Sequence, residues 1–167
     1  VRATPGGTGW IKCDANYVIP ILAKQEAIDN GYMEAIFLDA KERKYVEEGS
    51  SCNIFFYMKD GTLVTPSLED RILDGITRRS VLQLAKDLHV PTAERPVEIE
   101  EALSEATEVF VTGTAAGVSY IESITHQGKT AEYNNGTIGE LTAQLRKQLR
   151  GIQYGAVEDT HGWLYEV

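Results

Sequence analysis

Residues 45–65 read YVEEGSSCNIFFYMKDGTLVT, and this stretch decides the fold class. Residues 45–47 and 53–58 have the composition of β-strands, and Lys59-Asp60-Gly61 predicts a hairpin turn before a returning strand at 62–65. Further strands are expected elsewhere along the chain, at residues 34–39, 93–97, 108–112 and 118–122. Apolar spacing of the helical kind predicts helices at residues 17–30, 76–89, 99–104 and 138–152. Because these elements do not alternate regularly, we expect a mixed α/β (α+β) domain with a largely antiparallel sheet.

The composition describes a globular domain and excludes several functions. The chain has 167 residues, of which 43% are hydrophobic, so it can bury a core of its own. A net charge of -9 argues against nucleic acid as a partner, which would need a basic face. No apolar run is long enough to cross a membrane, and no signal peptide is visible. Two cysteines, Cys13 and Cys52, have no zinc-like spacing with the three histidines, so we expect no metal site and two free thiols in a reducing cytosol.

The first nine residues have the composition of a connecting segment. The chain opens on Val1 rather than Met, and residues 4–9 (TPGGTG) are rich in turn-forming glycine. We therefore expect residues 1–9 to be the remnant of an interdomain linker and residues 10–167 to form the domain.

Lys12 is the first residue that could carry chemistry. It follows the glycine-rich loop and apolar Trp10-Ile11, and it precedes a predicted helix. A buried ammonium is costly, so burial at this junction would favour the neutral amine, which is a nucleophile toward aldehydes. The alternative is an exposed, solvated lysine.

Two small-residue segments could bind an anion, and a pair of carboxylates precedes them. Glu47 and Glu48 end a predicted strand, where a carboxylate could hold a protonated ring nitrogen or face water. Leu73-Asp74-Gly75-Ile76-Thr77 leads into a helix, whose free N–H groups suit a phosphate, although Thr77 or Asp74 could simply cap the helix. Gly113–Gly117 joins two strands and could expose a nest of N–H groups, or could be a tight connection without a ligand.

Two further motifs carry no function in this interpretation. Residues 123–130 (SITHQGKT) end like a phosphate-binding loop, but Ser123 replaces the first glycine and no strong helix follows at once. Asn135-Gly136-Thr137 fits a glycosylation sequon, but nothing in the sequence indicates secretion.

The order and spacing of the four segments resemble the pyridoxal-phosphate aminotransferases of fold type IV, most closely the branched-chain amino acid type. The family's K-x-G-G-N-Y is similar to Lys12–Tyr17, and its E-G-x-x-x-N-[IL]-F to Glu48–Phe55. Its L-P-G-I-T matches Leu73–Thr77 with Asp74 in the place of proline, and its G-T-A-A matches Gly113–Ala116. The resemblance implies the large cofactor-binding domain of that fold, a largely antiparallel sheet or pseudo-barrel with flanking helices.

The resemblance also implies a role for each matched residue. Lys12 carries pyridoxal phosphate and is the catalytic residue, Tyr17 contacts the phenolic oxygen, and Glu48 binds the pyridine nitrogen. The phosphate is bound by residues near the helix start and in the later loop, namely Gly75, Ile76, Thr77 and Thr114. Ala115 and Ala116 face the substrate carboxylate.

The family's whole chain has a smaller N-terminal domain, which supplies an arginine to the phosphate; Arg2 precedes the Gly-rich segment and is not its match. The implied activity is transamination of leucine, isoleucine and valine with 2-oxoglutarate, by a cytoplasmic homodimer or larger oligomer. The 167-residue chain alone is expected to be weakly active or inactive. The alternatives are a D-amino acid aminotransferase, an aminodeoxychorismate lyase, or a truncated, non-catalytic binding module.

Overall fold

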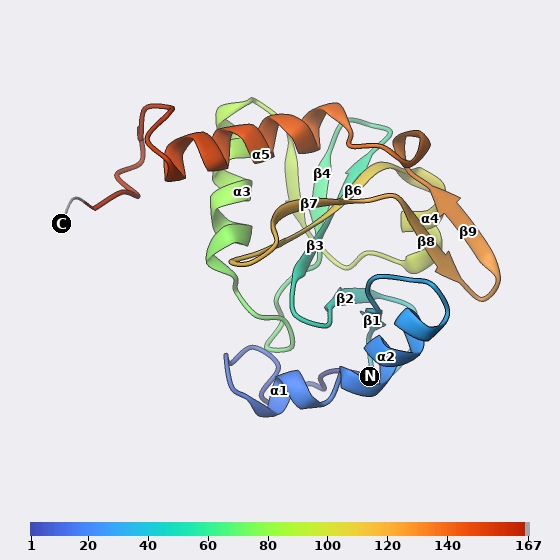
Figure 1. Cartoon of the computed structure of the whole chain (residues 1–167). Helices are drawn as coiled ribbons and strands as arrows, with labels where there is room; N and C mark the ends of the chain where they lie inside the picture. Colours follow the sequence, from blue (N-terminus) through green and yellow to red (C-terminus); the bar gives the residue numbers. More distant parts are fainter. Residues whose placement is uncertain (166–167) are drawn as a thin grey trace.

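The computed structural model describes residues 1–165, and its centre is a five-stranded mixed sheet (Figure 1). The strand order is β5-β4-β3-β6-β7, in which only the β4–β5 pair is parallel. The strands of this sheet are β3 (Asn53–Met58), β4 (Leu63–Thr65), β5 (Thr92–Glu94), β6 (Ala106–Gly113) and β7 (Gly117–Ile121). The predicted mixed fold is therefore confirmed, but the sheet formed by the described residues is open and not a closed barrel.

The central strand β3 is mostly apolar because both faces of the sheet are covered. Successive side chains of a strand point to opposite faces. Phe55 packs with α3 (Ile76–Asp87) and α5 (Glu140–Gln153), which cover one face in Figure 1. Ile54 and Phe56 pack on the other face with α4 (Ile99–Glu105). The predicted strands and hairpin of the 45–65 stretch are confirmed.

The predicted helix at residues 17–30 is wrong in one respect, since two helices occupy this stretch. They are α1 (Ala15–Val18) and α2 (Ile21–Asp29), and Pro20 is the N-cap of α2. Ile19 keeps helical backbone angles, but Pro20 has no N–H to donate to the carbonyl of residue 16 and its ring clashes with that carbonyl, which explains the interruption. The helix ends at Asn30 and Gly31 as predicted, but α2 buries none of its residues. In Figure 1, α1 and α2 lie on the side of the molecule opposite α5.

A second hairpin was not predicted. β8 (Ser123–His126) and β9 (Lys129–Glu132) pair antiparallel, followed by a short 3-10 helix, η1 (Asn134–Gly136). Gln127 and Gly128 both have positive φ, as a two-residue hairpin turn requires. The segment that ends like a phosphate-binding loop is thus a β-hairpin.

The tail follows α5 and packs only in part. His161 Nε2 lies 2.6 Å from Asp87 Oδ2 at the end of α3, and its ring stacks on Trp163. Tyr165 is 88% exposed and does not pack on the body. Residues 166 and 167, the end of the predicted domain, lie outside the described residues. No helix among residues 1–165 has the length and hydropathy to cross a bilayer.

Asp39 organises the turn that brings β1 (Ile36–Leu38) back to β2 (Val46–Gly49). Its carboxylate accepts bonds from four backbone N–H groups, those of Lys41, Glu42, Lys44 and Tyr45, at 2.6–3.2 Å. Burial alone would raise the pKa of Asp39, but these four donors outweigh it and lower the pKa to about 2.

Asp39→Ala should therefore reduce the free energy of unfolding by roughly 2–4 kcal/mol, because four backbone N–H donors in part-buried hydrogen bonds lose a charged acceptor. Urea unfolding measures this, with the exposed Glu42→Ala as the matched control. Equal stability of the two variants would contradict the role given to Asp39.

Candidate functional site

The loop that carries Lys12 is shaped by Asn16. The buried Asn16 amide donates to the carbonyl oxygens of Thr8 and Ile11, both at 2.7 Å, and accepts from Thr8 Oγ1 at 2.9 Å. These bonds close residues 8–11 into a fixed turn, which presents Lys12 at its end. Lys12 Nζ donates to Tyr17 Oη at 2.8 Å, so the amine and the phenol predicted to act together are adjacent.

Lys12 is exposed, so of the two alternatives for this residue the structure shows the solvated lysine. Its neighbours Trp10 and Ile11 are exposed as well, by 54% and 42%, so this end of the turn lies on the surface of the described chain. The amine therefore faces a space that residues 1–165 leave open.

Glu48 is the best buried carboxylate of the site. Its side chain is 3% exposed, and Oε1 accepts a hydrogen bond from Arg2 Nη1 at 2.5 Å. Burial raises the pKa of Glu48 to about 7, although the charge of Arg2 and the backbone N–H of Leu73 act in the opposite direction. Glu47 is equally buried and pairs with Arg71 at 3.4 Å, so the alternative of a solvated strand end is wrong for both residues.

The loop at residues 66–75 joins three of the four predicted segments. Leu73 donates its N–H toward Glu48 and accepts from Asn53 Nδ2 at 2.8 Å through its carbonyl. A Cβ placed on Gly9, just before Lys12, would clash with the carbonyl of Arg71. The Lys12 turn, the Glu48 strand and the start of α3 therefore all contact the same loop.

Helix α3 begins without a side-chain cap at Gly75. The predicted alternative, in which Thr77 or Asp74 caps the helix, is therefore wrong, and the first N–H groups remain available to an anion. The Asp74 carboxylate lies 3.8 Å from Arg78 Nη1 and 3.6 Å from Arg79 Nε. Its charge is thus paired with two arginines.

Gly75 is required for a close approach rather than for its φ, which is -67°. A Cβ on residue 75 would clash with Asn53 Oδ1, the side chain that holds Leu73. Gly75→Ala is expected to push Asn53 away and to reduce stability by about 1–3 kcal/mol.

A double-mutant cycle with Asn53→Ala tests this reason, since removal of the amide leaves room for the new methyl group. The cost of Gly75→Ala should be much smaller in the Asn53→Ala background. Additive costs would show that the close approach is not the cause.

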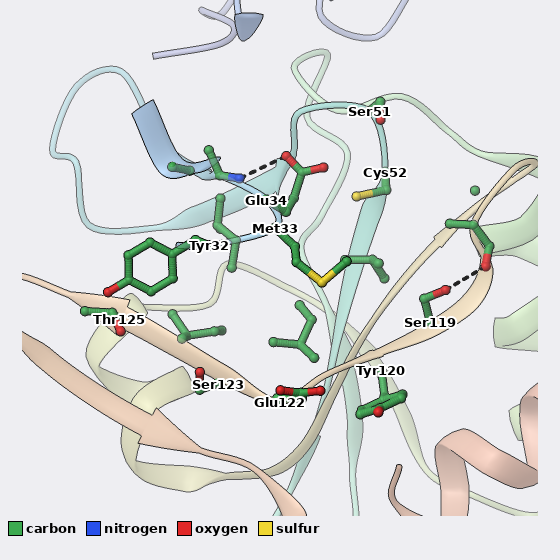
Figure 2. Close-up of a pocket in the computed structure, with 18 of the residues that line it drawn as sticks. Tyr32, Met33, Glu34, Ser51, Cys52, Ser119, Tyr120, Glu122, Ser123 and Thr125 are labelled. Atoms are coloured by element: carbon green, nitrogen blue, oxygen red, sulfur yellow. Dashed lines mark hydrogen bonds between the residues drawn. The ribbon is translucent and has the colours of Figure 1, made fainter. Parts of the chain in front are cut away.

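The fourth segment is the turn of the β6–β7 hairpin, and it lies beside the start of β3 and the turn that precedes it. Residue 113 packs near Ser51 and Cys52, and Asn53 pairs with Thr112 across the sheet. Thr114, Ala115 and Ala116 are exposed at the tip. They also line a cavity of about 860 Å³, into which the Met33 and Cys52 side chains point in Figure 2. Lys12, Glu48 and Ile76 do not line this cavity. The cavity therefore meets the predicted site residues only at this hairpin.

The geometry thus brings together an amine beside a phenol, a buried carboxylate, an uncapped helix start and an exposed hairpin. No group of three metal-ligating side chains occurs among residues 1–165. Sequence reasoning missed Arg2, which is 5% exposed and pairs with Glu48 from 46 positions away. No local sequence pattern indicates such an ion pair. Burial of Arg2 and Ala3 also shows that the expected linker packs on the body.

The chain belongs to the amino-transferase class IV family, whose family model matches residues 14–124. The chain is 45% identical over 172 residues to a branched-chain-amino-acid aminotransferase of Mycobacterium tuberculosis, covering 98% of this chain and 47% of the relative. Branched-chain amino acid aminotransferase 2, chloroplastic, of Humulus lupulus is 42% identical over 166 residues, covering 99% and 40%. The chain thus spans about half the length of the curated relatives it matches.

Solved structures of the same family confirm the predicted fold. The branched-chain amino acid aminotransferase of Escherichia coli superimposes with a TM-score of 0.87 at 35% identity, covering 99% of this chain and 52% of that one. The enzyme from Thermobaculum terrenum, solved in its PLP-form, gives 0.83 at 36% identity, covering 93% and 48%. The described residues therefore have the fold of half of a fold type IV aminotransferase.

Proposed function

We propose that this chain is the cofactor-binding part of a branched-chain amino acid aminotransferase that uses pyridoxal phosphate. The observation that carries the proposal is that the loop leading directly into the uncapped α3 start contacts both the Lys12 turn and the Glu48 carboxylate. Identity of 42–45% to curated relatives of this name supports it.

The donor set fits pyridoxal phosphate. The cofactor needs an amine for its aldehyde, a partner for its phenolic oxygen, an acid group for its ring nitrogen and N–H donors for its phosphate. In our assignment Lys12 and Tyr17 serve the first two, and Glu48 serves the ring nitrogen. The phosphate is bound at the α3 start by Gly75, Ile76 and Thr77, with Thr114 contributing a hydroxyl. The Asp74 charge is offset by Arg78 and Arg79.

The reaction assigns one task to each residue of the chain. Bound pyridoxal phosphate supplies an electron sink for the substrate α-carbon. Lys12 Nζ takes the α-proton as a general base and returns a proton as a general acid. Tyr17 Oη, which accepts from Lys12 at 2.8 Å, orients that amine. Glu48 keeps the ring nitrogen protonated, and backbone groups of Ala115 and Ala116 bind the substrate carboxylate.

The proposal includes the rest of the whole enzyme. We propose that a smaller preceding domain completes the site over the exposed Lys12 turn, so that residues 1–167 alone bind the cofactor weakly and transaminate poorly.

We also propose a homodimer or larger assembly, which the exposed apolar side chains of Leu22 and Met33 support. A cytoplasmic location is supported by two free thiols. Sedimentation equilibrium tests the assembly, and a monomer of the complete enzyme at micromolar concentration would contradict it.

A substrate panel tests the activity. The chain, joined to the domain that we propose precedes it, is supplied with L-leucine, L-valine, D-alanine or aminodeoxychorismate, and transfer to 2-oxoglutarate is measured. We expect turnover of the two L-amino acids. Preference for D-alanine or aminodeoxychorismate would replace this proposal with one of the other fold type IV activities, and no turnover of any compound would favour a non-catalytic binding module.

A further inference from the structure

Arg2 forms a buried ion pair whose existence needs an explanation. The Arg2 and Glu48 side chains are each 3% exposed, and Arg2 Nε is buried without a hydrogen-bond partner. A buried ion pair commonly costs as much in desolvation as it returns, and apolar side chains of similar volume would stabilise the fold equally well. The incompletely satisfied guanidinium makes a purely stabilising role still less favourable.

The ion pair is explained if Glu48 must stay in its ionised, carboxylate form. Burial without a cation would favour the neutral acid form of Glu48, which cannot hold a protonated ring nitrogen. Arg2 supplies that cation from outside the strand, and it contacts Oε1 at 2.5 Å. Because residue 2 belongs to a segment that packs beside the Lys12 turn, the same segment also links the carboxylate to that turn.

We propose that Arg2 is a positioning residue, which fixes the Glu48 carboxylate in the orientation from which Glu48 binds the cofactor's ring nitrogen. The inference rests on the proposed function, since it assigns Glu48 to pyridoxal phosphate. In this proposal Arg2 acts on the cofactor only through Glu48, with which it pairs.

The test uses the complete enzyme and pyridoxal phosphate as the probe, with two readouts besides activity. These are the dissociation constant of the cofactor and the pH at which its visible absorbance changes. Arg2→Met should weaken binding at least about tenfold, because a charge-assisted contact that orients Glu48 is lost, and should move the pH of the absorbance change. Arg2→Lys, which keeps the charge, should restore part of both. Arg95→Met, which removes the more exposed ion pair with Glu101, should change neither.

A double-mutant cycle separates positioning from direct contact. In a Glu48→Gln background, Arg2→Met should have no further effect on binding or absorbance, since Arg2 acts through Glu48. A full additional effect there, or unchanged binding by Arg2→Met alone, would overturn the inference. If the unsubstituted protein and Arg95→Met both fail to bind pyridoxal phosphate, the proposed function itself fails. If Arg2→Met does not fold, the comparison of Arg2→Lys with the unsubstituted protein decides.

Discussion

Replacing Lys12 with alanine is expected to lower the rate of amino-group transfer from L-leucine to 2-oxoglutarate by at least about 10³-fold in the complete enzyme. The residue is proposed both to carry the cofactor and to move the α-proton, so its loss removes two functions at once. Stability should hardly change, because Lys12 is exposed and, among residues 1–165, its side chain hydrogen-bonds only to Tyr17 Oη on the adjacent α1.

Lys41→Ala is the matched control, since it removes an equally exposed lysine on the β1–β2 turn. Addition of a small primary amine should restore part of the rate to Lys12→Ala, because a free amine can replace the proton-transfer function. A Lys12→Ala enzyme that retains a tenth or more of the original rate would contradict the catalytic role.

Glu48→Gln is expected to have the second largest effect, a loss of about 10²–10³-fold in turnover, because a neutral amide cannot keep the ring nitrogen protonated. It should also change the pH dependence of stability. Burial raises the pKa of Glu48 from 4.5 to about 7, against the opposing charge of Arg2. The folded state then binds the proton more tightly than the unfolded state, so this stabilisation is complete below pH 4.5 and is lost as the pH rises through about 7.

Urea unfolding of the apo-protein at a series of pH values measures this contribution. Glu48→Gln should flatten the decline in stability between pH 4.5 and 7, while part of the decline remains because burial also raises the pKa of Glu47. Glu42→Gln, on the exposed turn, should leave the profile unchanged. An identical pH profile for Glu48→Gln and the unsubstituted protein would show that the Glu48 carboxyl is not titrating in this range.

The elements that could be predicted from sequence are those whose signal is local. Residues 54–58 are mostly apolar because a strand buried on both faces needs no polar side, and Val81, Leu84 and Ala85 repeat at helical spacing because only one face of α3 is covered. The 66–75 loop brings three of the predicted site segments together. The order of the motifs indicated that these segments meet, but their spacing alone could not indicate it.

The features that could not be predicted depend on distant contacts or on a single overlooked residue. The Arg2–Glu48 pair joins residues 46 apart, so no periodicity reveals it. The apolar neighbours of Lys12 left its burial open, and Trp10 and Ile11 are themselves exposed. By contrast, two features have local sequence signals. Pro20 interrupts the helix, and the Gln127-Gly128 turn joins the strands of the β8–β9 hairpin.

The central claim is that the Lys12 amine carries pyridoxal phosphate, and covalent trapping tests it most directly. The protein is saturated with pyridoxal phosphate, reduced with borohydride and digested, and the peptides are mapped by mass spectrometry. We expect one pyridoxyl group per chain, on the peptide that contains Lys12, and its loss in Lys12→Ala but not in Lys41→Ala. An adduct spread over surface lysines, or none on residue 12 under saturation, would contradict the account.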